Sequence, residues 1–225
     1  MVDSVPTAMP YHGDRPLKVL CLGHSFIRRL GEYVKKPHYS DKLHQFSKTN
    51  LWLSQQEFQV IYIGYGGSTI GRNGKKPILK HLHYIGIYHT DILFVQMGSN
   101  DLCRPDCDPF QLSKDVFKIC DFIRVAYETK VIVLGQILHR SGKGLPVLVP
   151  DYNQRVDATN RAVASGTRCN PHYMFCWHDK FTCTTKNVYT DDGIHLNKHT
   201  GYPKYSYSVR GAVLRARDLI VTNRW

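Results

Sequence analysis

Short apolar runs that alternate with helix-length segments are the feature that most constrains how this 225-residue chain folds. Each run is a nearly continuous stretch of apolar residues rather than an alternation of apolar and polar ones. Such runs are typical of strands that are buried on both faces, as in parallel sheets. The five predicted strands are Lys18–Leu22, Phe58–Ile63, Asp91–Met97, Lys130–Ile137 and Tyr173–Trp177.

Helix-length segments separate and follow these runs. The clearest is Pro109–Glu128, where apolar residues recur at roughly helical spacing and Pro109 suits the first turn. The others are Ser25–Val34, Lys76–Tyr84, Asp151–Ser165 and about Pro203–Ile220. Strands alternating with helices predict an α/β protein, a three-layer α/β/α sandwich around a central parallel five-stranded sheet. We expect residues 1–15 to be a flexible lead-in and residues 16–225 to form one domain.

Composition narrows the class of protein. Hydrophobic residues make up 42% of the chain, which is enough for a substantial core and excludes a disordered protein. No apolar run approaches the roughly 18 residues that a membrane span needs, and the N-terminus lacks the apolar region of a secretory signal. We therefore expect an intracellular protein, most simply a cytoplasmic one. Its formal net charge of +12 favours acidic or polyanionic partners, nucleic acid among them.

Four polar segments have the positions that parallel sheets use for chemistry, in loops after strands or before the last helix. They hold a serine at a strand-to-helix turn, a glycine-rich loop, a side-chain amide, and a carboxylate followed three residues later by an imidazole. These are the parts of a nucleophilic acyl-transfer site. The segments are Leu22–Ile27, Gly64–Thr69, Gly98–Asp101 and Asp192–Asn197.

The order and spacing of these segments resemble the SGNH, or GDSL-type, hydrolase superfamily, whose four blocks supply Ser, Gly, Asn and His. The resemblance runs from Leu17 to the last helix. It implies an esterase that needs no cofactor and acts on a small or acylated substrate. A looser similarity, through the segment GHSFIRRL, is to animal proteins and retroelement-encoded reading frames.

Carried over by motif, the resemblance implies a role for each block residue. Ser25 corresponds to the nucleophile, and its N–H to one oxyanion donor. Gly67 and Asn100 correspond to the other two donors, although Gly66 offers a second register for the glycine. His195 and Asp192 match the D-x-x-H pair of general base and orienting carboxylate.

The chain departs from the family pattern at one position, because the usual Gly-Asp-Ser reads Gly23-His24-Ser25. The replaced Asp is not a member of the triad, so no reaction step is lost. The way in which the loop is held must nevertheless differ.

Each site residue also has a plain structural interpretation. Ser25 could be a helix N-cap, and the glycines and the Asn100-Asp101 pair could be turn formers. His195 could be a buried hydrogen-bonded histidine.

The alternative function is a catalytically idle module that binds nucleic acid or another polyanion through its basic surface. The basic residues form three clusters: Arg28, Arg29, Lys35 and Lys36; Arg72, Lys75, Lys76 and Lys80; and Arg210, Arg215, Arg217 and Arg224.

Two other kinds of site do not fit the spacing. The glycine-rich stretch ending at Lys76 lacks the hydroxyl residue and the first glycine of a phosphate-binding loop. Among the cysteines and histidines near the C-terminal half, only Cys103 and Cys107 have zinc-ligand spacing. We therefore expect reduced free thiols and no metal.

Overall fold

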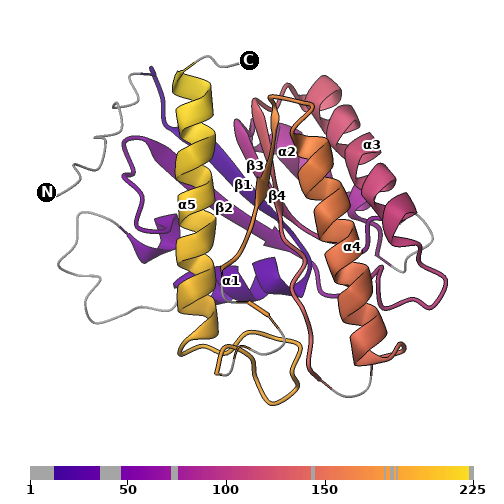
Figure 1. Ribbon diagram of the computed structural model, residues 1–225. Helices are drawn as coiled ribbons and strands as arrows, with labels where there is room; N and C mark the ends of the chain where they lie inside the picture. The colour runs from indigo at the N-terminus through magenta and orange to yellow at the C-terminus, as the bar shows by residue number, and fades with distance from the viewer. Residues whose placement is uncertain are drawn as a thin grey trace, which may run out of the picture.

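The computed structural model describes residues 13–35, 47–71, 76–142, 145–179, 181–182, 185 and 187–222. Its strands form one sheet in the order β2-β1-β3-β4-β5, and all neighbouring strands run parallel (Figure 1). The strands are β1 (Leu17–Gly23), β2 (Phe58–Gly64), β3 (Ile92–Gln96), β4 (Val131–Gly135) and β5 (Tyr173–Cys176). The predicted five-stranded parallel sheet is therefore confirmed.

Helices cover both faces of the sheet and complete the three layers that the sequence predicts. One face carries α1 (Ser25–Lys35) and α5 (Gly201–Val221). The other carries α2 (His83–Ile87), α3 (Pro109–Tyr127) and α4 (Val149–Thr167). Figure 1 shows α5 in front of the strands, with α1 near its lower end, and the pair α3 and α4 on the other side of the picture.

Two hydrophobic cores, one on each side of the sheet, explain the uninterrupted apolar runs. Side chains alternate along a strand, so Val19 and Cys21 of β1 pack towards α1 and α5, whereas Leu20 and Leu22 pack towards the other helices. Because helices cover both faces of the sheet, the strand residues that point to either face must be apolar.

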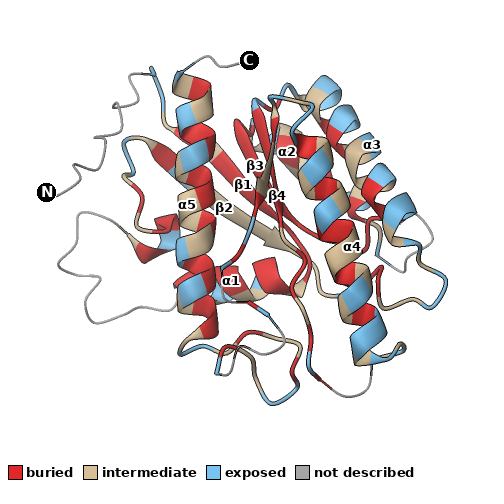
Figure 2. Ribbon diagram, viewed as in Figure 1, coloured by how far each residue is buried: buried red, intermediate tan, exposed pale blue. Residues whose placement is uncertain are grey.

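The edge strands are less buried than the sequence predicts. Six of the seven residues of β2 are partly or fully exposed, and the expectation that this strand is buried on both faces is wrong (Figure 2). The reason is its position, since β2 lies at one edge of the sheet and has a single neighbouring strand, β1. In β5, at the other edge, the central Met174 and Phe175 are half-buried.

One predicted helix is also corrected. The segment Lys76–Tyr84 does not form a continuous helix; it forms the 3-10 turn η3 (Ile78–His81), followed by the short α2. Pro77 has an extended backbone and bridges to Thr69, which prevents a helix from starting before Ile78. The other four helices begin and end within two residues of their predicted limits.

Two glycines let α1 start directly at the end of β1. A Cβ on Gly64, the last residue of β2, would lie 2.2 Å from the backbone nitrogen of Arg28. A Cβ on Gly23 would lie 2.5 Å from the carbonyl oxygen of Gln96 in β3. The first turn of α1 therefore packs against the carboxyl end of β2, and the end of β1 packs against that of β3, next to the candidate site.

The N-terminal lead-in is only partly described. Residues 1–12 lie outside the described residues, and Arg15 forms an ion pair with the buried Asp91 across 2.7 Å. None of the described helices is long and apolar enough to cross a membrane.

Candidate active site

Ser25 is the first residue of α1, and its neighbour His24 caps the helix. The Nδ1 atom of His24 accepts the Phe26 N–H at 3.4 Å, and its carbonyl oxygen accepts the N–H groups of Ile27 and Arg28. The N-cap role that Ser25 could have had thus belongs to His24. Within the described residues the Ser25 hydroxyl makes no hydrogen bond, so it stays free at the positive end of the helix dipole.

The glycine loop after β2 exposes its backbone at Gly67. This residue has a φ of +80°, and a Cβ built on it would meet no atom within 4 Å. Among the described residues its N–H has no backbone hydrogen-bond partner, whereas the next N–H, of Ser68, donates to Tyr65. Gly66 is equally open but lacks the positive φ. The Gly67 N–H is therefore available to a bound oxyanion.

Asn100 and Asp101 both hold the glycine loop. Asn100 Nδ2 donates to the carbonyl oxygen of Ser68 at 2.8 Å, which leaves its second hydrogen free. The carboxylate of Asp101 accepts the N–H groups of Ile70 and Gly71 at 3.0 and 2.9 Å. Burial raises the pKa of Asp101, although these two N–H groups act in the opposite direction. Asn100 thus lies in a turn and also donates a hydrogen bond to the glycine loop.

His195 and Asp192 form a hydrogen-bonded pair before α5. His195 Nδ1 lies 2.6 Å from Asp192 Oδ2, while Asp192 Oδ1 accepts both the His195 N–H and the Thr190 hydroxyl. Burial would raise the pKa of Asp192, but these hydrogen bonds outweigh it and lower the pKa well below the usual range. Asp192 thus stays ionised and fixes the ring, which leaves Nε2 as the free nitrogen of His195.

Direct contacts join all four segments at the carboxyl ends of the strands. The Tyr65 N–H donates to the carbonyl oxygen of Gly23, and Asn100 contacts Ser68. The rings of Phe26 and His195 meet edge to face with their centroids 6.3 Å apart, which places His195 beside the first turn of α1. In the described part of the chain, no hydrogen bond joins Ser25 Oγ to His195 Nε2.

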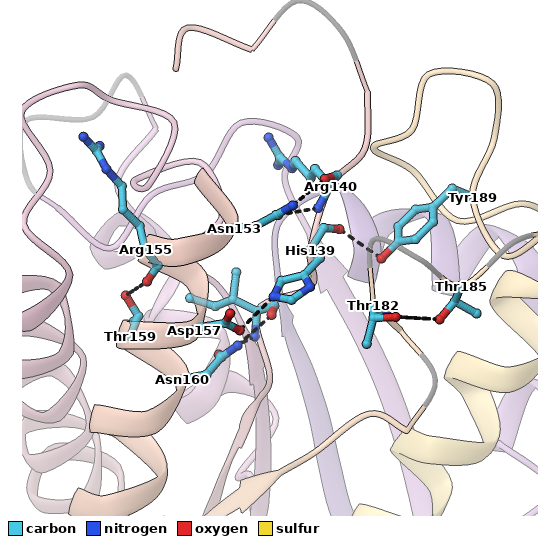
Figure 3. A network of polar contacts seen from close by, with 11 residues as sticks. His139, Arg140, Asn153, Arg155, Asp157, Thr159, Asn160, Thr182, Thr185 and Tyr189 are labelled. Atoms are coloured by element: carbon cyan, nitrogen blue, oxygen red, sulfur yellow. Dashed lines mark hydrogen bonds and ion pairs between the residues drawn. The ribbon is translucent and has the colours of Figure 1, made fainter. Parts of the chain in front are cut away.

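The loop that carries Asp192 is anchored from the neighbouring strand. The N–H groups of Ser141 and Gly142, after β4, donate to the carbonyl oxygen of Gly193 at 2.9 and 3.2 Å. The Tyr189 hydroxyl donates to the carbonyl oxygen of His139, as Figure 3 shows. These contacts fix the His195–Asp192 pair relative to the sheet.

No protein-family model matches the chain, and no curated protein does. Solved structures do match. A GDSL-like lipase from Bacteroides thetaiotaomicron superposes with a TM-score of 0.63 at 13% identity over 88% of this chain and 88% of that one. The acetyl xylan esterase AlAXEase gives 0.62 at 16% over 88% and 100%, and TesA gives 0.61 at 18% over 88% and 99%. The chain shares their fold.

The SGNH hydrolase fold that the sequence resemblance implies is therefore confirmed. Identities this low establish the fold, whereas the chemistry depends on the residues at the site. The chain departs from the GDSL pattern at His24, and the structure shows contacts of this residue that sequence reasoning missed. His24 Nε2 lies 3.0 Å from Ser99 Oγ, and Arg140 Nη2 donates to the same oxygen at 3.2 Å. Arg140 is 116 residues from His24 in the sequence, so no local pattern could have paired them.

The expected basic clusters are only partly visible. Lys36, Arg72, Lys75 and Arg224 lie outside the described residues. Arg28 pairs with Glu32 on the same helix at 2.6 Å, and Arg217 contacts Asp218 and Glu57.

The six described cysteines are free thiols, and Cys183 lies outside the described residues. The described residues contain no group of three metal-binding side chains.

Proposed function

We propose that this protein is a serine hydrolase that cleaves ester bonds. The observation that carries the proposal is the pairing of an ionised Asp192 with His195 beside the helix turn on which the unbonded Ser25 hydroxyl lies. The nucleophile comes from one segment, and the base and the orienting carboxylate come from another segment 170 residues away. Together they supply the three groups of a Ser-His-Asp triad.

The chemistry follows from the free atoms at the site. His195 Nε2 accepts the Ser25 proton as Oγ attacks the ester carbonyl, and Asp192 stabilises the imidazolium that forms. The developing oxyanion binds the N–H groups of Ser25 and Gly67 and the free Asn100 N–H. His195 then donates the proton to the leaving alcohol. Water, activated by the same nitrogen, hydrolyses the acyl-enzyme.

Active-site labelling tests the proposal before any natural substrate is known. The wild-type protein should react with a serine-directed fluorophosphonate and hydrolyse short p-nitrophenyl esters. Ser25→Ala should do neither, and it should unfold within a few degrees of wild type because His24, and not Ser25, caps α1. Labelling that persists in Ser25→Ala would overturn the assignment of the nucleophile.

A second candidate function, single-stranded nucleic-acid binding, is favoured by one groove. Residues 52–58 and α5 enclose a groove of about 500 Å³. Trp52, which lines the groove, stacks on Tyr207 with the ring centroids 5.1 Å apart, and Tyr207 is 58% exposed. Arg210 lines the groove and has no hydrogen-bond or ion-pair partner in the described part of the chain. An exposed Tyr207 ring, stacked on the half-buried Trp52 and close to an unpaired guanidinium, suits bases and phosphates.

This groove is separate from the proposed catalytic site. It lies at Phe58, where β2 begins, whereas Gly67 follows the opposite end of that strand. The two functions are therefore compatible and can be removed independently.

A further inference from the structure

Arg140 is a buried cation that has no carboxylate partner among the residues that the structure describes. Its side chain, in the loop after β4, is 7% exposed, and no described carboxylate lies within ion-pair distance of it. Its contacts are neutral: Cys103 Sγ at 2.8 Å, Ser99 Oγ at 3.2 Å and the ring of Tyr152 at 5.0 Å. Burying an unpaired charge costs free energy, so the presence of a positive charge at this position indicates that it has a role.

Both backbone polar groups of Arg140 are hydrogen-bonded to one side chain. Asn153 of α4 accepts the Arg140 N–H at 2.9 Å and donates to its carbonyl oxygen at 2.9 Å, as Figure 3 shows. The side chain therefore starts from a fixed point and reaches Ser99, which is 1% exposed and lies after β3. Ser99 is the link to the proposed site, since the same hydroxyl oxygen contacts His24.

The hydrogen bonds of His24 require one state of its ring. Nδ1 faces the Phe26 N–H and must act as an acceptor, so the ring proton must be on Nε2, which then donates to Ser99 Oγ. In a protonated ring Nδ1 also carries a hydrogen. The Nδ1–H and the Phe26 N–H, both donors, would then face each other. Protonation would also add a positive charge to a helix N-terminus that is already positive.

We propose that Arg140 and Ser99 are positioning residues that hold His24 as the neutral Nε2–H tautomer, and that His24 thereby sets the first turn of α1, which carries Ser25. This inference rests on the proposed function, because the turn matters for reaction only if Ser25 reacts. A carboxylate at position 24, as in the usual Gly-Asp-Ser, is already anionic and accepts the N–H directly. A histidine there needs neighbours that keep it neutral.

The surroundings of His24 agree with this role. The pKa of His24 is lowered from 6.5 to about 3, chiefly by burial and then by the positive charges of Arg140 and His195. Arg140 comes from the loop after β4 and His195 from the segment before α5. Ser99 supplies the neutral acceptor from the loop after β3. The guanidinium thus disfavours the imidazolium while Ser99 selects the tautomer.

Nitrogen-15 spectra of the His24 ring test the proposal without any substrate. We expect wild type to show the Nε2–H tautomer at pH 7. Arg140→Met should raise the pH at which His24 protonates by about one pH unit, whereas Arg140→Lys, which keeps the charge, should not. Ser99→Ala should mix the two tautomers. Cys103→Ala is the matched control, because it removes another contact of the same guanidinium and should change neither property.

Kinetics and amide exchange supply the second readout. In Arg140→Met the Phe26 amide should exchange about fivefold faster, as expected for a weakened hydrogen bond. In the same variant kcat should fall with KM little changed, since the ester-binding groups are intact. If Arg140→Met does not fold, Ser99→Ala decides, because its His24 ring should lose the single Nε2–H tautomer.

Two results would overturn the inference: an Nδ1–H or protonated His24 in wild type at pH 7, or an Arg140→Met protein with wild-type ring titration and tautomer. Failure of wild type to hydrolyse any ester or to bind fluorophosphonate would instead refute the proposed function, and the ring spectra would still decide the state of His24.

Discussion

Asn100 Nδ2 donates to the carbonyl oxygen of Ser68 at 2.8 Å and so joins the loop after β3 to the glycine loop after β2. One amide hydrogen is used for this link, and the other is free for an oxyanion. The same side chain therefore shapes the loop that presents the Gly67 N–H. Two of the three proposed oxyanion donors depend on one residue.

Asn100→Ala should consequently lower both turnover and stability. The lost donor acts mainly in the transition state, so kcat should fall by about 10² to 10³ while KM changes little. Loss of the Ser68 contact should cost about 1 kcal/mol of unfolding free energy. Ester hydrolysis and urea denaturation measure the two effects. A change confined to KM would make Asn100 a substrate-binding or turn residue only.

Gly66 and Gly67 form a matched pair for locating the backbone donor. At both positions a Cβ would have no atom within 4 Å, so a methyl group fits at either, and only Gly67 has a φ of +80°. Gly67→Ala should strain the backbone by about 1 kcal/mol and turn its N–H away, lowering kcat. Gly66→Ala should retain near-normal kcat. The reverse result would move the donor to Gly66.

The pH dependence of stability should reflect two buried histidines. Burial lowers the pKa of both His24 and His178 from 6.5 to about 3, with Arg140 and Arg215 as the next causes. The folded state keeps both rings neutral, whereas the unfolded chain takes up a proton on each below pH 6.5. Their contribution is thus complete above pH 6.5 and is lost as the pH falls towards 3.

At pH 5 this loss should amount to about 2 kcal/mol for each ring. Urea denaturation at pH 7.5 and 5.0 measures it. His199 is exposed, so His199→Gln should show the same loss as wild type. Equal stability of wild type at the two pH values would contradict the buried neutral state of both rings.

The sequence predicts the fold well because the helices and strands bury their apolar residues in regular patterns. Val19 to Leu22 show this directly, since neighbours in the strand pack into different cores. The exposure of β2 could not be predicted in the same way. A strand's place at the edge depends on the order of pairing, and its own residues do not encode that order.

The site is predictable where its partners are close in the chain. The spacing of Asp192 and His195 indicates a pair, and Asp192, not Asp191, contacts the ring. The network behind Ser25 is different. Arg140 carries no motif, and its link to His24 through Ser99 results from the packing of three strand ends. Sequence reasoning therefore noticed the unusual His24 without finding what holds it.

The basic surface gives the last prediction, because its residues differ in what they already contact. Arg210 has no partner among the described residues, whereas Arg28 pairs with Glu32 at 2.6 Å. If the groove binds single-stranded RNA or DNA, Arg210→Ala should reduce the slope of log affinity against log salt by about 0.7. Tyr207→Ala should weaken binding at every salt concentration with the slope unchanged, because stacking releases no counterions. Arg28→Ala is the control and should change the slope less than Arg210→Ala. Fluorescence anisotropy across a salt series, repeated with Ser25→Ala, measures all of these. Absence of binding at low salt would reject a nucleic-acid partner, and binding retained by Ser25→Ala would show that the groove works independently of the proposed nucleophile.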